Sequence, residues 1–372
     1  MDQIGLAIIG CGAVVTGRHL PALAAISGAQ VCCVYDPDIE AARRVAAGTG
    51  ARIAAALEEA VQFKDVQAVV IASPNAFHRQ GVEAAADAGK HILCEKPLAT
   101  NLRDARAAQE AARRAGVVLQ LGFHHRFTSE FRLVRRLLEA GAIGAVHSFQ
   151  ATMSEPFDVI PGGSANYRLD PKLSGGLTLI DFGSHRIDQL RALAGDAREI
   201  SACFTSAGGH GLDDNVVLLV AAQSGAIGAL SFHRFSRGAL APATLIGKKG
   251  VLCFNAYVAN PFHAAPVAVF TEEPLPPDVA VFTRPQDWWS PPRSGWIELW
   301  PPVVNPFIEE YKAFFGALRS GQISAATGED GYKALEIVMA AYKAHHARRA
   351  VALPLDPEEV IPLPALTPAA SA

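Results

Sequence analysis

Residues 4–15 are Ile-Gly-Leu-Ala-Ile-Ile-Gly-Cys-Gly-Ala-Val-Val, and this stretch decides the fold of the first third of the chain. It opens with a short apolar run, as expected of a strand buried on both faces of a sheet. Gly10 permits a tight turn after that strand, and Gly12 lets the backbone approach a pyrophosphate at the next helix's amino terminus. Val15 replaces the third glycine of the G-x-G-x-x-G pattern, which weakens the match. The residues expected at the pyrophosphate are Gly10, Gly12, Ala13 and Val14.

Strand-like and helix-like segments alternate from this turn as far as residue 122. The expected strands after the first are 30–35, 66–72, 91–94 and 117–121, and the expected helices are 19–27, 39–47, 80–89 and 102–115. Alternation of this kind predicts βαβ units. We therefore expect an α/β domain over residues 1–122, with a doubly wound parallel sheet and helices on both faces.

The pattern changes at residue 123, beyond which apolar runs follow one another without intervening helices. These runs are 146–153, 200–206, 215–222, 226–235, 243–246 and 251–255. Such a succession predicts an antiparallel or mixed sheet, and three amphipathic helices are expected at 130–140, 307–318 and 328–346. We predict an α+β substrate and oligomerisation domain over residues 123–353 and an extended or disordered tail over 354–372. The proline-rich segment 256–303 receives no assignment.

The bulk composition is that of a soluble globular protein. The chain has 372 residues, of which 50% are hydrophobic and 19% charged, and its formal net charge is -3. That balance does not support nucleic acid or an anionic membrane as a partner, because both require clustered cations. The six cysteines lack zinc-ligand spacing and indicate buried free thiols in a reducing compartment. With no secretory signal and no long apolar run to cross a membrane, we expect a cytoplasmic protein.

Asp36 ends the second expected strand, about 20 residues after the glycine turn, where an acidic residue is expected to bind the adenosine ribose. Its carboxylate would accept hydrogen bonds from both ribose hydroxyls and repel a 2′-phosphate, which favours NAD over NADP. The alternative is a plain turn aspartate before Pro37. Arg43 and Arg44 lie farther along the next helix, where a solvated face is favoured over phosphate binding.

Two more polar motifs follow buried strands, where the carboxyl ends of parallel strands line the cofactor crevice. Ser73-Pro74-Asn75 with His78 follows the strand 66–72, and Glu95-Lys96-Pro97 follows the strand 91–94. The first motif is also an ordinary helix-start signal, and a lysine after a strand is in isolation more often solvated. The expected cofactor neighbours from these motifs are Ser73, Asn75, His78, Glu95 and Lys96.

The ordered set of motifs resembles the Gfo/Idh/MocA family of glucose–fructose oxidoreductases, inositol dehydrogenases and rhizopine-catabolism proteins. Besides the three motifs above, the set contains Gly175-Gly176-Leu177-Thr178-Leu179-Ile180-Asp181-Phe182-Gly183-Ser184-His185 and Gly328-Glu329-Asp330-Gly331. The resemblance implies a Rossmann domain followed by a domain with an open, largely antiparallel sheet, through which a homodimer or homotetramer forms. It implies that Lys96 binds the reacting hydroxyl and that Asp181 and His185 belong to the active site.

The chemistry of these three residues suits the oxidation of an alcohol. If Asp181 begins a helix, His185 lies on the same face one turn later, so both side chains can address one ligand. A histidine with an ordinary pKa near 6.5 accepts a hydroxyl proton at neutral pH, and Lys96 would stabilise the developing alkoxide. Asp181 would hold a substrate hydroxyl. The alternative for His185 is a capped core histidine, and Asp188 is interpreted as structural.

The chain departs from the family pattern where the substrate is expected. Leu177 follows Gly175-Gly176 in place of a third glycine, and Tyr167-Arg168 stands where many members have tryptophan and arginine. Tyr167, Arg168 and Arg126 are the expected substrate residues, although an interdomain salt bridge is the alternative for Arg126. Trp288-Trp289 would stack on a sugar ring or lie in an oligomer interface.

No metal is expected, although the sequence contains two pairs of adjacent histidines. These are His124-His125 and His345-His346. Adjacent side chains on a strand point to opposite faces, and neither pair has acidic or cysteine partners at useful spacing.

These observations predict an NAD-dependent dehydrogenase that oxidises a secondary hydroxyl of a sugar, cyclitol or related polyol, or catalyses the reverse reduction. One alternative is a glycosidase that uses held NAD for transient oxidation and elimination. Another is a nucleotide-sensing regulator on the same fold. The presence of Lys96, Asp181 and His185 together argues against the regulator, because a pure sensor does not need all three.

Overall fold

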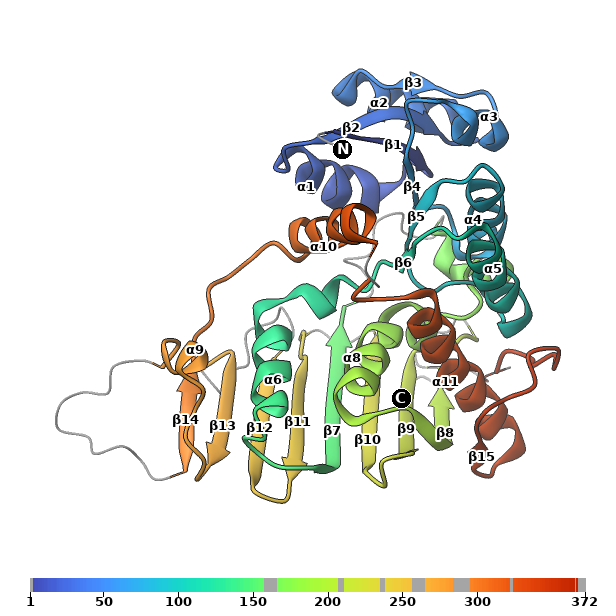
Figure 1. The fold of residues 1–372 in the computed structure, drawn as a ribbon. Helices are drawn as coiled ribbons and strands as arrows, with labels where there is room; N and C mark the ends of the chain where they lie inside the picture. The colour runs from blue at the N-terminus through green and yellow to red at the C-terminus, as the bar shows by residue number, and fades with distance from the viewer. Residues whose placement is uncertain are drawn as a thin grey trace.

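The computed structural model describes residues 3–156, 166–206, 211–234, 238–255, 265–283, 295–321, 324–364 and 366. They form two sheets, one above the other in Figure 1. The upper sheet has six strands in the order β3-β2-β1-β4-β5-β6, and the lower has nine in the order β14-β13-β12-β11-β7-β10-β9-β8-β15.

All the strand pairs of the six-stranded sheet are parallel, which confirms the doubly wound architecture. Its strands are β1 (Ile4–Ile9), β2 (Ala29–Tyr35), β3 (Arg52–Ile53), β4 (Ala68–Ile71), β5 (His91–Cys94) and β6 (Leu119–Leu121). Its helices are a π-helical turn (Val15–His19), α1 (Leu20–Ala24), α2 (Ile39–Thr49), α3 (Leu57–Gln62), α4 (His78–Asp87) and α5 (Leu102–Ala115). Every residue of β1 is buried, and its side chains alternate between two cores on opposite faces.

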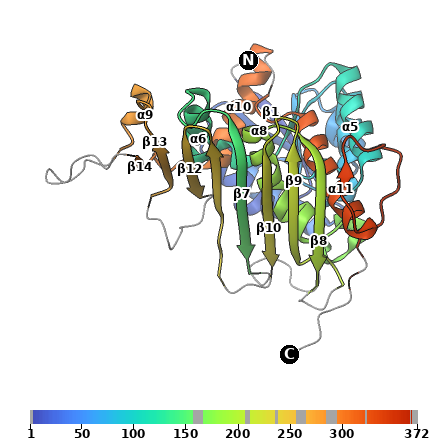
Figure 2. The same ribbon diagram turned by 90° about the horizontal axis from the view of Figure 1, so that it is seen from below.

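The second sheet is mixed and mostly antiparallel, as expected; of the described pairs only β7 with β10 is parallel. Its strands are β7 (Val146–Glu155), β8 (Ala197–Thr205), β9 (Asn215–Ala222), β10 (Ile227–Arg234), β11 (Pro242–Gly247), β12 (Gly250–Asn255), β13 (Val267–Thr271), β14 (Trp296–Leu299) and β15 (Val351–Ala352). Helices α6 (Ser129–Glu139), α8 (Ser184–Ala194) and α11 (Gly328–Ala347) cover one face, and Figure 2 shows the opposite face open.

The helix α10 (Pro306–Ser320) packs against the first sheet, although it lies late in the chain (Figure 1). Phe307, Tyr311, Phe314 and Phe315 share a core with β1. A helix from beyond the predicted boundary at residue 122 therefore packs on the first sheet.

The segment left unassigned contains β13, the short helix α9 (Pro277–Ala280) and β14, whereas Trp288-Trp289 lies outside the described residues. In the carboxy-terminal tail, Leu355 is buried and its amide donates to Glu336 of α11, and Glu359 pairs with Lys343. One cysteine differs from expectation, because Cys203 is exposed on β8. Among the described helices, none has the length and apolar character to cross a membrane.

Candidate active site

The glycine turn after β1 has the backbone geometry expected at a pyrophosphate. Gly10 has a φ of 91°, and a Cβ there would lie 2.6 Å from the backbone of Ala72 and Ser73, so only glycine fits. A Cβ at Gly12 would meet no atom within 4 Å, which leaves space for a phosphate. Val15 is fully buried in the core between α1, α2 and the sheet, so its side chain has a packing role where the motif has glycine.

Asp36 fixes this turn and still has capacity for a ligand. Its Oδ2 accepts from the Cys11 amide at 2.7 Å, and its Oδ1 accepts from the Asp38 amide at 2.8 Å. Each carboxylate oxygen keeps another lone pair for a ribose hydroxyl. Arg43 is exposed and pairs with Glu40, consistent with a solvated helix face.

Ser73 is the residue of the Ser73-Pro74-Asn75 motif whose side chain makes no hydrogen bond in the described structure. The Ser73 hydroxyl is buried without a hydrogen-bond partner, as expected of a group that a ligand satisfies. The Asn75 amide donates to the Ser174 carbonyl at 2.8 Å and joins the two domains. The two ring nitrogens of His78 lie 2.7 Å from the Pro97 carbonyl and 2.9 Å from the Ser73 carbonyl. His78 therefore helps to hold the loop that carries Lys96. Burial lowers the pKa of His78.

Glu95 belongs to a buried chain of polar groups that the sequence did not indicate. Its Oε1 lies 3.1 Å from Nε2 of His19, whose Nδ1 lies 2.9 Å from the Tyr311 hydroxyl. Burial opposes ionisation of Glu95, but His19 outweighs it and the pKa of the carboxyl is lowered. A Cβ at Gly122 would lie 2.9 Å from this carboxylate, so the site requires glycine there. The chain ties α10 to the end of β5, next to Lys96.

Lys96 is held by Asp181, which lies 85 positions later in the sequence. The ammonium group donates to Oδ1 at 2.6 Å and to the backbone carbonyl of Asp181 at 2.9 Å. An ammonium has three donors, so one N–H remains for a substrate oxygen.

Asp181 bonds to three cationic side chains, and its contact with a substrate hydroxyl stays a prediction. Its Oδ2 accepts from Nε of Arg168 at 3.0 Å and from Nη2 of Arg234 at 2.9 Å, in addition to the Lys96 contact. Burial alone would raise the pKa of Asp181, but the three cations outweigh it and hold that pKa well below its usual range. Sequence reasoning missed Arg234, whose only signal was its position at the end of an expected strand.

His185 is a buried imidazole at the start of α8. Its ring stacks on His125 with centroids 4.2 Å apart, and it contacts His124 edge-on at 4.7 Å. Burial, then the neighbouring His125 and Lys96, lower the pKa of His185 well below its usual value. The Nδ1 atom is buried without a hydrogen-bond partner. At neutral pH the side chain is therefore neutral and able to accept a proton.

Comparison with known proteins shows to which family the chain belongs. Residues 4–123 match the model described as "Oxidoreductase family, NAD-binding Rossmann fold", and residues 131–253 match the GFO/IDH/MocA C-terminal domain. The chain is 32% identical over 359 residues to D-apiose dehydrogenase of Paraburkholderia graminis, covering 93% of this chain and 89% of that protein. The chain belongs to the Gfo/Idh/MocA family.

A second relative, levoglucosan dehydrogenase of Pseudarthrobacter phenanthrenivorans, is 30% identical over 217 residues. That match spans 51% of this chain and 56% of the relative's length. A solved structure of levoglucosan dehydrogenase in complex with NADH and levoglucosan has a TM-score of 0.82 and 23% identity, covering 95% of this chain and 100% of that one. It supports the Gfo/Idh/MocA fold.

The two departures from the Gfo/Idh/MocA pattern lie in segments that make specific contacts. The amides of Leu177 and Leu179 both donate at 2.8 Å to the carboxylate of Asp213, a buried residue that the sequence did not single out. Burial raises the pKa of Asp213 to about 6. Tyr167 donates to Asn75 at 3.4 Å, and the guanidinium of Arg168 lies 4.9 Å from the Tyr167 ring centroid. Of Tyr167 and Arg168, only Arg168 has a hydrogen bond to Asp181 among the described residues.

Arg126 forms salt bridges, as its alternative predicted, but both acidic partners lie beyond residue 122 in the same domain, so the bridges are not interdomain. It makes two bonds of 2.6 Å to Asp188, one of 3.0 Å to Asp330 and one of 2.8 Å to the Ala325 carbonyl. All three nitrogens of its guanidinium are therefore used to tie the segment between the sheets to α8 and α11. Asp188 is a structural partner here.

The prediction of no metal assumed that His124 and His125 lie on a strand, and that assumption is wrong. His124-His125 lies in a 3-10 turn (His124–Phe127), so the two rings contact each other with centroids 4.6 Å apart. One nitrogen from each of His124, His125 and His185 lies within 4.8 Å of the others. The absence of a metal stays a prediction.

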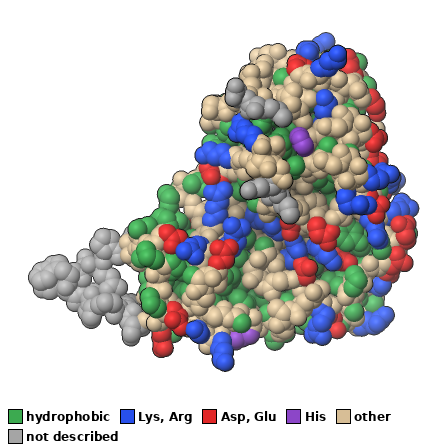
Figure 3. Space-filling view, in the orientation of Figure 1, with side chains coloured by type: hydrophobic (Ala, Val, Ile, Leu, Met, Phe, Trp, Pro, Cys, Tyr) green, Lys and Arg blue, Asp and Glu red, His purple; other side chains and the backbone are tan. Residues whose placement is uncertain are grey.

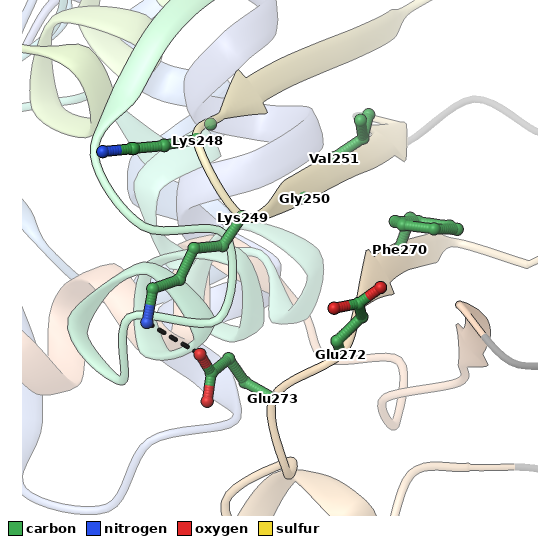
Figure 4. A pocket seen from close by; sticks show the side chains of 8 residues that line it. Lys248, Lys249, Gly250, Val251, Phe270, Glu272 and Glu273 are labelled. Atoms are coloured by element: carbon green, nitrogen blue, oxygen red, sulfur yellow. Dashed lines mark hydrogen bonds and ion pairs between the residues drawn. The ribbon is translucent and has the colours of Figure 1, made fainter.

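Basic and acidic side chains intermingle along the junction of the upper and lower parts in Figure 3. A separate surface hollow lies at the β11–β12 turn, where Lys249 pairs with Glu273 at 2.7 Å (Figure 4). None of its lining residues belongs to the expected site.

The lowered pKa of His185 predicts an unusual pH dependence. If a neutral His185 accepts the hydroxyl proton, kcat/KM for alcohol oxidation falls only when the pH drops below its depressed pKa. We expect the acidic limb of the profile below pH 6.5, in wild type and in the surface variant His147→Asn. A limb centred at pH 7 or above, or one that persists unchanged in His185→Asn, would contradict this assignment.

Proposed function

We propose that this Gfo/Idh/MocA protein is an NAD-dependent dehydrogenase that oxidises a secondary hydroxyl of a sugar, cyclitol or related polyol, or reduces the corresponding ketone. The observation that carries the proposal is Lys96 at the end of β5, 2.6 Å from Asp181, with one donor unused. The names of the relatives, D-apiose dehydrogenase and levoglucosan dehydrogenase, support this substrate class.

The protein's part in the reaction is to hold an oxygen and move a proton. Lys96 donates its remaining N–H to the substrate hydroxyl oxygen and stabilises the negative charge that develops there. His185 accepts the hydroxyl proton, and Asp181 keeps the ammonium in place. When bound, NAD supplies the acceptor for the hydride that leaves the substrate carbon.

The residues proposed to hold NAD are the Gly10–Gly12 turn, Asp36 and Ser73. They fit the cofactor because the space at Gly12 is open, Asp36 has free lone pairs and the Ser73 hydroxyl is an unsatisfied buried group. Purified protein incubated with NAD and a polyol panel, followed by the absorbance of reduced nicotinamide, tests the proposal. Glycoside cleavage without net reduction would favour the glycosidase, and nucleotide binding without turnover would favour the regulator.

Asp36 is expected to set the cofactor preference. Asp36→Ser removes the carboxylate that binds the ribose and repels a 2′-phosphate, so the ratio of kcat/KM for NAD over NADP should fall by about 10–100-fold, or about 1–3 kcal/mol of discrimination. Initial rates with both cofactors measure the ratio. Asp87→Asn, an exposed change on α4, should leave it unchanged. An unaltered ratio in Asp36→Ser would refute the role.

We further propose a cytoplasmic homo-oligomer that associates through the open face of the second sheet. Val217, Leu219 and Ile227 are 46%, 59% and 62% exposed there, an apolar group on a face without helices. Leu219→Glu should shift the species seen by light scattering from dimer or tetramer toward monomer. A wild-type protein that is monomeric at micromolar concentration would exclude the oligomer.

A further inference from the structure

The guanidinium of Arg234 is buried and only partly used. Arg234 ends β10 and is 4% exposed, and its Nη2 donates to Asp181 at 2.9 Å. Its Nε and Nη1 atoms are buried without hydrogen-bond partners. The group lies 5.0 Å from the ring centroid of Phe182, which provides no acceptor oxygen. Buried donors of a charged group are costly unless a partner satisfies them, so these N–H groups are suited to a ligand oxygen.

Arg234 belongs to a cluster in which three cationic side chains converge on one carboxylate. Lys96, Arg168 and Arg234 all bond to the single carboxylate of Asp181. Glu155 is the register partner of Arg234 on β7, but its side chain makes no hydrogen bond or ion pair within the described residues. Burial raises the pKa of Glu155, which disfavours its charged form.

The other nearby carboxylates have partners of their own. Glu95 faces His19, and Asp213 accepts from two backbone amides of the loop before α8. Among the groups that bond directly to Asp181, three cationic side chains therefore share one carboxylate.

We propose that the substrate is an anionic polyol, a sugar acid whose carboxylate is bound by Arg234 and Arg168 while its reacting hydroxyl faces Lys96. This inference rests on the proposed function and specifies its substrate class. A guanidinium offers paired donors that match a carboxylate, and Arg168, 26% exposed at its side chain, lies toward the open side of the same cluster.

Matched substrate pairs test the proposal with the full-length protein and NAD. The pairs are D-glucuronate with D-glucose and D-gluconate with D-glucitol, and D-glucose 6-phosphate is the phosphate arm. We expect kcat/KM for at least one acid to exceed that of its neutral partner by 10-fold or more. In Arg234→Gln that ratio should fall at least 10-fold, mainly through KM for the acid. Arg136→Gln, an exposed arginine on α6, should keep the wild-type ratio.

The outcomes separate this inference from the proposed function. Neutral polyols oxidised as well as the acids, or the phosphate ester preferred over the acids, would overturn the sugar-acid inference and leave the dehydrogenase standing. If no compound is oxidised, the dehydrogenase fails, and calorimetric titration of glucuronate and glucose into protein with NADH decides the anion site by itself. Tighter glucuronate binding that Arg234→Gln weakens supports it, and equal or absent binding overturns it. Arg168→Gln supplies the same comparison should Arg234→Gln not fold.

Discussion

Replacing Lys96 with methionine should lower kcat for polyol oxidation by about 10³-fold or more. Lys96 supplies the one cationic donor that has a free N–H beside the proposed hydroxyl position, since its other two are engaged by Asp181. Methionine keeps most of the length of the side chain and removes the charge. The alkoxide that develops in the transition state would then lose its stabilising cation. Steady-state rates with saturating NAD and substrate measure the effect.

The control for this change is Lys248→Met, which removes an exposed lysine from the β11–β12 turn and should leave kcat unchanged. Binding of NADH, followed by its fluorescence, should be retained in Lys96→Met within about 10-fold, because the residues proposed to hold the cofactor are intact. Wild-type kcat in Lys96→Met would exclude the lysine from the chemistry. Loss of both NADH binding and activity would instead indicate a structural defect.

Replacing Asp181 with asparagine should destabilise the fold by about 3–5 kcal/mol and abolish activity. The side chain keeps its shape, but three cations lose the one anion that they share. The loss of folding free energy therefore comes from buried positive charges that have lost their counter-ion, and not from a cavity. Urea denaturation at pH 7 measures the loss, and Asp278→Asn, which breaks an exposed ion pair with Arg136, should leave the midpoint close to wild type.

The effect of Asp181→Asn has a defined dependence on pH. The folded-state pKa of Asp181 lies below that of the unfolded chain, so its contribution is fully present above about pH 4 and is lost as pH falls toward the folded value. The stability difference between wild type and variant should thus be constant from pH 7 to 5 and shrink below pH 4. The double variant Asp181→Asn with Arg168→Gln should recover part of the loss, because one uncompensated cation is removed. A difference that grows as pH falls would show that the ionised carboxylate is not the stabilising species.

Much of the fold and part of the candidate site could be predicted from local pattern. Residues 4–9 predicted a strand buried on both faces, and β1 is that strand. The lysine motif was placed near the cofactor crevice because parallel strands end at the same edge of a sheet. The roles within the site were less predictable. Asp181 was expected to hold a substrate hydroxyl, which stays a prediction, but its bonds to Lys96, Arg168 and Arg234 were not foreseen.

The sequence by itself determined the order of strands and helices, the glycine turn and the motifs at strand ends, because these depend on short-range periodicity and on backbone conformations such as the positive φ of Gly10. Only the tertiary structure decided the partners: Arg234 with Asp181, Tyr311 with His19, and α10 with the first sheet. A hydrogen bond requires two atoms to lie within about 3 Å, and residues far apart in the chain reach that distance only after the sheets and helices have packed. The motifs at strand ends therefore predict a reaction class from the sequence. The three cations that bond to Asp181, which only the structure brings together, further indicate a substrate with a negative charge.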